Sequence, residues 1–268
     1  MILNFINLLL HTNLKHSFKK KEVESRLDEL LSLMKIMFFM NLDLTNKNAI
    51  VCGSTKGIGF ASAKELASLG ANLTLLARNE EKLKQCVDEL PIPNGQQHQY
   101  LVADFDKPKE LKAKIDRYIS INNTVHILVN NSGGPPGGPI IESDVSEFQT
   151  AIQRHLECNH ILVQSLFEGM NKTGYGRIIN IISTSVKEPI NNLGVSNTTR
   201  GAVASWSKTL ANEITSNGIT VNNVLPGFTE TQRLQGLIEK KAENTGKNIE
   251  TIREEMLSKI PMGKFGKP

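Results

Sequence analysis

The stretch Ala49-Ile-Val-Cys-Gly-Ser-Thr-Lys-Gly-Ile-Gly59 decides the fold. A short apolar run ends at a turn with three glycines, and the segment that follows has the length and composition of a helix. Glycine permits a tight turn and lets the backbone come close to a ligand phosphate, which then lies at the N-terminus of the helix. Because no Gly-Lys-Ser/Thr sequence completes the turn, this is not a P-loop.

From Asn48 onward, short apolar runs alternate with helix-length segments, a pattern typical of βαβ units and a parallel sheet. We expect an α/β protein with a doubly wound parallel sheet, the three-layer Rossmann fold, and a ligand crevice at the carboxyl ends of the strands. The expected strands are Ala49–Cys52, Asn72–Leu76, Gln99–Val102, His126–Val129, Arg177–Ile182 and Thr220–Leu225. The expected helices are Ile58–Leu69, Glu80–Leu90, Pro108–Ser120, Ser146–Met170 and Arg200–Ser216.

Length and composition limit the classes of function. A chain of 268 residues with 39% hydrophobic and 22% charged residues suits one water-soluble domain. The net charge of +4 is small and the cations are dispersed, which argues against a nucleic-acid partner. No apolar run approaches the roughly 20 residues of a transmembrane helix. Three cysteines without metal-ligand spacing predict no metal site and favour a cytoplasmic protein.

The chain divides into an atypical extension over residues 1–40 and a dinucleotide-binding and catalytic Rossmann domain over residues 41–268. The extension has an apolar start, a basic segment and a stretch, Glu22–Met40, with amphipathic spacing. A helix on a membrane surface is one interpretation of it. The favoured interpretation is a disordered or helical extension, or a start site assigned too early.

Five motifs, in the same order, make residues 42–268 resemble the short-chain dehydrogenase/reductase family. They are Gly53-x-x-x-Gly57-x-Gly59, Asp104-Phe105, Asn130-Asn131-Ser132-Gly133, Pro226-Gly227 with Thr231, and residues 260–266. The resemblance implies an adenine contact at the second motif and a nicotinamide-side loop at the fourth. It also implies that the family's last helix and strand are lacking after Pro268, which would leave an exposed sheet edge and reduce stability.

The charges near the turn favour NADP(H) as the cofactor. An acidic residue at the end of the second strand suits NAD, whereas Arg78 there, with Lys56 in the turn, suits a 2′-phosphate. Alternatively, Arg78 merely caps or solvates the strand end. The cofactor-binding residues expected from the turn and the resemblance are Gly53, Ser54, Thr55, Lys56, Gly57, Ile58, Gly59, Arg78, Asn79, Asp104, Phe105, Asn131, Ser132, Gly133, Arg200, Pro226, Gly227 and Thr231.

The catalytic positions depart from the family, whose members use Ser, Tyr, Lys and Asn. Ser183 occupies the place of the family's Ser, but Ser196 and Arg200 stand where Tyr and Lys are expected, and His155 stands in place of Asn. A serine hydroxyl is far too weak an acid to replace a phenol, and arginine does not release its proton. Arg200 could still bind the ribose or stabilise negative charge on a substrate oxygen.

His155 is the substitute proton donor that we hypothesise, directly or through a water, because histidine titrates near neutral pH. The alternative is a structural histidine bonded to a neighbouring backbone group. The glycine- and proline-rich loop over residues 130–139 is either a rigid wall beside the nicotinamide or an ordinary surface loop. Residues 229–259 correspond to the family's substrate lid, where the apolar side chains have the spacing of core contacts.

The branch of the family with Ser-x-x-x-Arg resembles 3-oxoacyl-carrier-protein reductases. The sequence therefore predicts an oxidoreductase that transfers a hydride between NADP(H) and a small carbonyl or alcohol substrate, and that forms a homo-oligomer, a dimer or tetramer. The alternative is a catalytically impaired NADP(H)-binding protein that acts as a sensor or partner subunit. A methyltransferase on a similar sheet is disfavoured by the third and fourth motifs.

Overall fold

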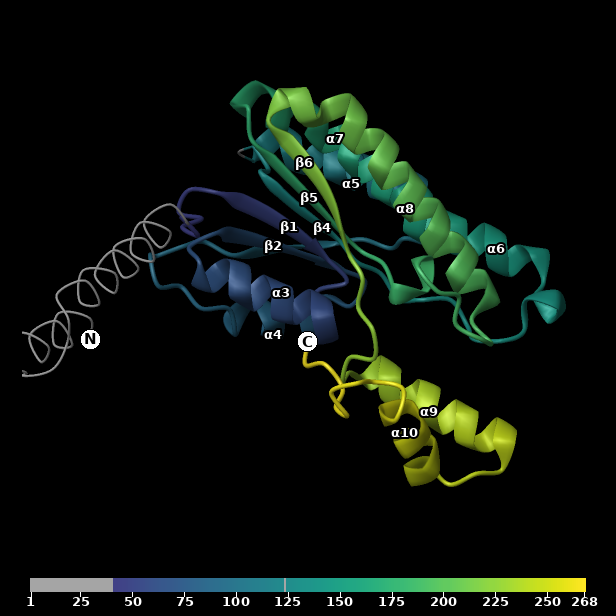
Figure 1. Cartoon of the computed structure of the whole chain (residues 1–268). Coiled ribbons are helices and arrows are strands. Elements are labelled where there is room, and N and C mark those ends of the chain that lie inside the picture. Colours follow the sequence, from purple (N-terminus) through teal and green to yellow (C-terminus); the bar gives the residue numbers. More distant parts are fainter. Residues whose placement is uncertain (1–40, 123) are drawn as a thin grey trace, which may run out of the picture. The chain divides into compact units, whose positions relative to one another are not determined.

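Six parallel strands form one sheet in the order β3-β2-β1-β4-β5-β6 (Figure 1). The computed structural model describes residues 41–122 and 124–268, and residues 44–268 form one compact unit. The extension expected over residues 1–40 lies outside the described residues. The strands are β1 (Asn48–Cys52), β2 (Asn72–Ala77), β3 (Gln99–Val102), β4 (Ile127–Asn130), β5 (Gly176–Ile181) and β6 (Ile219–Val224). The expected Rossmann-type fold is confirmed, with each strand within one residue of its predicted bounds.

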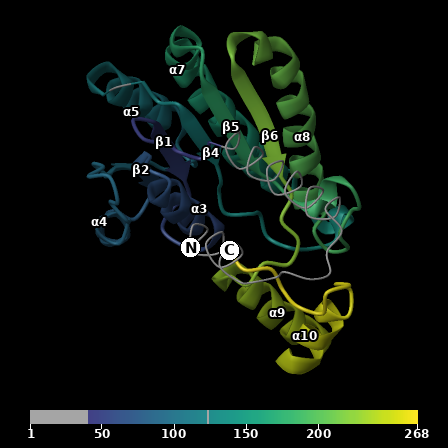
Figure 2. The ribbon, with the colours of Figure 1, turned by 60° about the vertical axis from the view of Figure 1, so that its left-hand side comes forward.

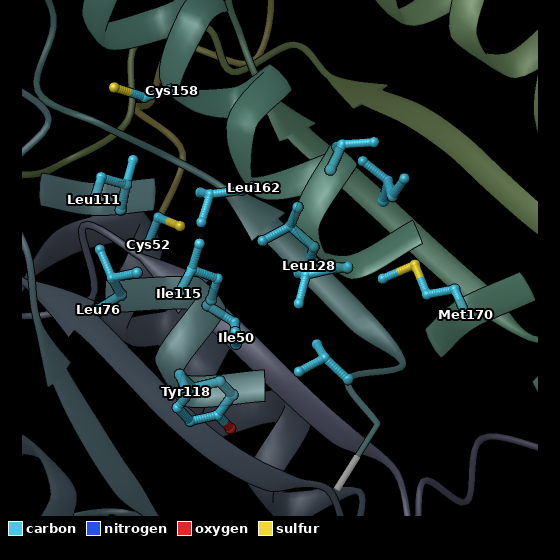
Figure 3. Packing of buried hydrophobic residues seen from close by; sticks show 14 of the residues in the cluster. Ile50, Cys52, Leu76, Leu111, Ile115, Tyr118, Leu128, Cys158, Leu162 and Met170 are labelled. Atoms are coloured by element: carbon cyan, nitrogen blue, oxygen red, sulfur yellow. The ribbon is translucent and has the colours of Figure 1, made fainter. Parts of the chain in front are cut away.

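Helices cover both faces of the sheet, which gives the predicted three layers (Figures 1 and 2). One face carries α3 (Gly57–Ser68) and α4 (Glu80–Asp88), and the other carries α5 (Pro108–Ile121), α7 (Cys158–Thr173) and α8 (Gly194–Ile214). The alternation of side chains along β1 explains the two cores. Ile50 and Cys52 belong to the cluster with α5 and α7 (Figure 3), whereas Ala49 and Val51 pack on the α3 side.

Two helices differ from their predicted bounds by more than two residues. The segment expected to be one helix over Ser146–Met170 consists of α6 (Val145–Ile152), a π-helical turn over Gln153–Glu157, and α7. The apolar spacing continues through all three, so the sequence pattern does not reveal the turn. Helix α8 begins at Gly194 rather than at Arg200, and its N-cap, Leu193, forms no side-chain cap. Without a Ser, Thr, Asp or Asn cap, the sequence carries no signal for that start.

The C-terminal region forms a helical pair with a core of its own. Helices α9 (Gln232–Thr245) and α10 (Ile249–Leu257) follow β6. Of the apolar side chains expected to be core contacts, four are buried there together with Ala242 and Phe265: Leu234, Ile238, Ile252 and Met256. Leu237 is half-buried, and Ile249 is exposed, so the expectation is wrong for Ile249. Among the described strands β6 pairs only with β5, so its outer edge is exposed, and Val224 is 46% accessible.

Candidate functional site

The three glycines of the turn between β1 and α3 stand at positions that do not suit a larger residue. Gly53 and Gly57 have φ values of +57° and +55°, in the left-handed region that favours glycine. A Cβ on Gly59 would lie 2.3 Å from the carbonyl oxygen of Gly53. Asn131, just after β4, donates from Nδ2 to the carbonyls of Cys52 and Gly53, both at 3.2 Å. The turn is therefore a bare backbone cradle at the N-terminus of α3, which fits a phosphate group.

Most side chains of the turn contact other parts of the protein and stabilise the turn. Ser54 is buried, and its hydroxyl donates to the carbonyl of Leu76 at 3.4 Å. Ile58 packs into the core on the α3 side, and the carbonyl of Thr55 accepts from Cys86. Beyond its one exposed cation, Lys56, this turn therefore offers a ligand mainly its backbone.

Thr231, from the fourth motif, lies beside the glycine turn. A Cβ on Gly57 would lie 3.3 Å from Cγ2 of Thr231, and the Thr231 hydroxyl caps α9 by accepting from the amide of Leu234. Lys56 donates to Oε1 of Gln232 at 3.2 Å. The start of α9 and the glycine turn are thus in direct contact.

The two cations expected near a 2′-phosphate both remain exposed. Arg78 follows β2 with a side chain that is 69% accessible, and its only ion pair within the described residues is a loose one, 3.8 Å from Asp106. Asn79 caps α4 by accepting from the amide of Lys82, so its side chain already has a structural partner. An exposed guanidinium with one weak partner can turn to a phosphate at little cost.

The acidic motif after β3 leads into a network that the sequence did not reveal. The side chain of Asp104 accepts a hydrogen bond from the amide of Asp106. The carboxylate of Asp106 accepts two more from Arg154, one from Nε and one from Nη2, the latter at 2.7 Å. The hydrogen bonds from Arg154 hold the pKa of Asp106 below its usual value. The carbonyl of Phe105 accepts from Gln153 at 3.2 Å. Asp106 and Arg154 lie 48 residues apart in sequence, and no local pattern predicts such a pair.

His155 lies in the π-helical turn and contacts Ser132, not Ser183. Its Nδ1 is 2.7 Å from Oγ of Ser132, and the residue is 1% accessible. Its Nε2 is buried without a hydrogen-bond partner in the described part of the chain. Burial, followed by the positive charges of Arg200 and Arg154, lowers the pKa of His155 well below its usual value. The ring is therefore neutral at neutral pH. It can supply a proton only by passing one on while it takes up another.

A cavity of about 230 Å³ lies against His155 and the proline-rich loop. Its lining is mainly apolar and comes from that loop, α6 and the π-helical turn: Pro135, Pro136, Ser146, Glu147, Thr150, Ala151, Arg154 and His155. Pro135 and Pro136 therefore form one wall of a hollow, and a position of this wall beside the nicotinamide stays a prediction. The cavity is smaller than a typical drug-sized pocket, so it suits a small group or a few waters.

The remaining predicted catalytic residues lie around the ends of β5 and β6. Ser183 caps a short 3₁₀ helix by accepting from the amide of Ser185 at 3.0 Å. Arg200 donates from Nη1 to the carbonyl of Ile181 at 3.0 Å. Ser196 lies in the first turn of α8, and no side-chain hydrogen bond involves it within residues 41–122 and 124–268. The loop at Pro226 and Gly227 adjoins them, because the carbonyl of Pro226 accepts from Thr184.

Burial, with the charge of Arg233 adding to it, lowers the pKa of Arg200 to about 10. Arg200 therefore stays cationic at neutral pH. The neighbouring Arg233 was missed by the sequence analysis. It follows Thr231 by two residues, but nothing in the spacing indicated that it reaches back to the proline-rich loop.

Metal ligands, membrane-spanning helices and reactive cysteines were considered over the described residues. Within residues 41–122 and 124–268, no cluster of His, Cys, Asp or Glu could hold a metal ion, and no helix is long and apolar enough to cross a membrane. Cys52, Cys86 and Cys158 are free and buried. Burial raises the pKa values of Cys52 and Cys158 to about 12, so neither thiol is a reactive nucleophile.

Comparison with known proteins identifies the family. The profile of the short chain dehydrogenases matches residues 47–242. The chain belongs to this family. Short-chain dehydrogenases are oxidoreductases that use NAD(P), which fits the bare glycine turn at the N-terminus of α3.

Several reductases are similar to it in sequence or in structure. A 3-oxoacyl-[acyl-carrier-protein] reductase of Rickettsia prowazekii is 31% identical over 229 residues, covering 85% of this chain and 86% of the relative. An L-sorbose reductase of Gluconobacter frateurii, solved with NADPH and L-sorbose, has a TM-score of 0.79 at 27% identity, covering 85% and 88%. An actinorhodin polyketide ketoreductase solved with NADPH has a TM-score of 0.77 at 28% identity, covering 83% and 85%.

Proposed function

We propose that this short-chain dehydrogenase reduces a small carbonyl compound with NADPH, in the manner of a 3-oxoacyl reductase, or oxidises the corresponding alcohol with NADP⁺. The observation that carries the proposal is the pairing of a glycine turn, whose backbone is open at the N-terminus of α3, with an exposed cation, Arg78, at the end of the neighbouring strand. The Rickettsia reductase and the two NADPH-bound structures support the same assignment. Assembly as a dimer or tetramer and a cytoplasmic location stay predictions.

The chain offers a binding group for each part of NADP(H). The backbone of the glycine turn would hold the diphosphate, Arg78 and Lys56 the 2′-phosphate, Asp104 the adenine, and Arg200 the nicotinamide ribose. When bound, the cofactor supplies the hydride. Ser183 and Ser196, neither of which is fully buried, would hydrogen-bond the carbonyl oxygen of the substrate.

Proton delivery is assigned to His155 acting through Ser132. In reduction, Ser132 gives its hydroxyl proton to the substrate oxygen and takes a replacement from Nδ1 of His155. In the same step the ring takes a proton at Nε2 from solvent through a water in the adjoining cavity, which leaves the neutral ring as its Nε2–H tautomer. Proton exchange with solvent restores the Nδ1–H tautomer before the next turnover. A neutral ring can do this, whereas a charged donor is disfavoured by the burial of His155.

The alternative, an NADP(H)-binding protein without catalysis, has an observation of its own in its favour. All three tyrosines of the chain have partners away from the candidate site: Tyr100 bonds Glu80, Tyr118 contacts Thr74, and Tyr175 lies under Arg177. No phenol therefore replaces the family's acid. In this case the protein would act as a sensor or partner subunit.

Titration with NADPH and NADH by fluorescence tests the cofactor assignment. We expect NADPH to bind more tightly, and Arg78→Ser to weaken NADPH binding about tenfold while leaving NADH unchanged. Arg117→Ser, which removes an exposed arginine of α5, is the matched control and should change neither affinity. If neither NADPH nor NADH binds, both candidate functions are contradicted.

An NADPH-oxidation screen over 3-oxoacyl thioesters, ketones and quinones separates the two candidates. Turnover supports the reductase, whereas binding without turnover on any class supports the sensor. If turnover is found, His155→Asn should reduce it by about a hundredfold and remove the pH dependence that the relay imposes. An unchanged rate and pH profile would refute the role given to His155.

A further inference from the structure

Two arginines from separate elements meet at the proline-rich loop. Arg200 comes from the second turn of α8 and Arg233 from the first turn of α9. A Cβ placed on Gly134 would lie 3.5 Å from Nη2 of Arg233 and 4.0 Å from Nη2 of Arg200. Arg233 also donates from Nη2 to the carbonyl of Pro135 at 2.7 Å. Two guanidinium groups thus face one small space beside the loop.

These two cations lack the neutralising partners that nearby arginines have. Arg154 is paired with Asp106 and Arg253 with Glu230, but within the described residues no carboxylate lies within 4.0 Å of Arg200 or Arg233. Their hydrogen bonds to backbone carbonyls use only part of the donors of each guanidinium. Like charges held close together destabilise a structure unless an anion joins them.

We propose that Arg200 and Arg233 together bind an oxyanion group, carboxylate or phosphate, of the molecule reduced at this site. This inference rests on the proposed function and names its substrate class, an acidic carbonyl compound. A planar guanidinium offers parallel donors that match the two oxygens of a carboxylate or phosphate. Gly134 leaves the space between the two groups empty, and its backbone is not in the left-handed region, so glycine is not required there for conformation.

The location favours a substrate over the cofactor as the source of the anion. The pair adjoins Pro135, which also lines the cavity beside His155. The diphosphate already has a proposed place over the N-terminus of α3. However, Thr231 links that turn to α9, so a phosphate of the cofactor is the other source of the same chemistry, and the test must distinguish the two.

Thermal unfolding of the protein without nucleotide tests the pair directly. Phosphate and malonate should raise the midpoint relative to chloride at equal ionic strength, because an anion that binds only the folded state stabilises it. Arg233→Gln, which can still donate to Pro135, and Gly134→Ala, which fills the space, should each reduce the affinity for both anions about tenfold. Arg117→Gln is the control and should behave as the parent. Equal anion effects in all four proteins would overturn the proposal.

The same variants identify the source of the anion. If the substrate supplies it, Arg233→Gln leaves the NADPH dissociation constant within about twofold, and in turnover it raises the KM of a 3-oxo acid but not that of its methyl ester. If the cofactor supplies it, Arg233→Gln weakens NADPH and NADH alike, which would overturn the substrate class. The anion measurements use no nucleotide, so loss of NADPH binding alone would refute the proposed function and not the anion site.

Discussion

The glycine turn and the first turns of α8 both follow a strand of the same sheet, but different atoms define them. The turn is defined by the backbone, because a side chain at Gly53, Gly57 or Gly59 would be strained or would clash. Asn131 also holds the start of the turn by donating to the carbonyls of Cys52 and Gly53. The α8 region is defined by side chains, since Ser196 and Arg200 lie on an ordinary helix that would accept other residues. A site made by the backbone tolerates few sequences, whereas a site made by side chains can change its chemistry without changing the fold.

The largest effect that we expect is in the turn. Gly59→Ala should abolish measurable NADPH binding, a loss of at least about a hundredfold, because its Cβ would lie 2.3 Å from the Gly53 carbonyl and force the cradle open. Fluorescence titration measures the affinity and thermal unfolding the stability. Gly236→Ala, in α9 with no atom near its Cβ, is the control and should stabilise the protein by about 0.5–1 kcal/mol. If Gly59→Ala binds NADPH as the parent does, the turn is not the phosphate cradle.

The same contrast explains how far the sequence could predict the molecule. Glycine spacing and alternating apolar runs depend on local sterics and burial, so they predicted the glycine turn and the six strands. The contacts of Ser132 with His155 and of Asp106 with Arg154 join residues 23 and 48 positions apart. Such contacts depend on the π-helical turn and on loop paths that no periodicity records. His155 was predicted as a candidate, but its partner and burial were not.

Asp106 links the end of β2 to the π-helical turn, because it pairs with Arg78 after β2 and with Arg154 beside His155. Asp106→Asn should destabilise the protein by about 1 kcal/mol at pH 7, a modest effect since the pair is partly exposed. The pKa of Asp106 is lowered in the folded state, so its contribution is present above the usual aspartate pKa and disappears as the pH falls through the lowered value. Urea unfolding of both proteins between pH 7 and pH 3 measures this.

Asp88→Asn, which removes an exposed carboxylate at the end of α4, is the control for Asp106 and should have no effect at either pH. The stabilities of the parent and of Asp106→Asn should converge in acid. A difference that stays constant from pH 7 to pH 3 would mean that the ion pair with Arg154 contributes nothing, and that the asparagine perturbs the loop after β3 for another reason.

The smallest expected effect is on the charge state of His155. Arg200→Gln should raise the pKa of His155, because it removes a nearby positive charge while a glutamine can still donate to the carbonyl of Ile181. The pKa should stay below the usual histidine value, since burial is the larger cause and is unaltered. NMR titration of ring-labelled histidine measures this. Arg233→Gln is the control: Arg233 is not among the groups that shift the pKa of His155, so no change is expected.

The variant Arg200→Gln also tests whether Arg200 and His155 act together in turnover. If His155 relays a proton in turnover, the acid limb of the pH–rate profile should move in Arg200→Gln in the same direction as the pKa of the ring. A raised pKa with an unmoved acid limb would separate the histidine from proton delivery and leave it a structural partner of Ser132. An unchanged pKa would mean that the charge of Arg200 does not reach the ring, and that burial alone keeps His155 neutral.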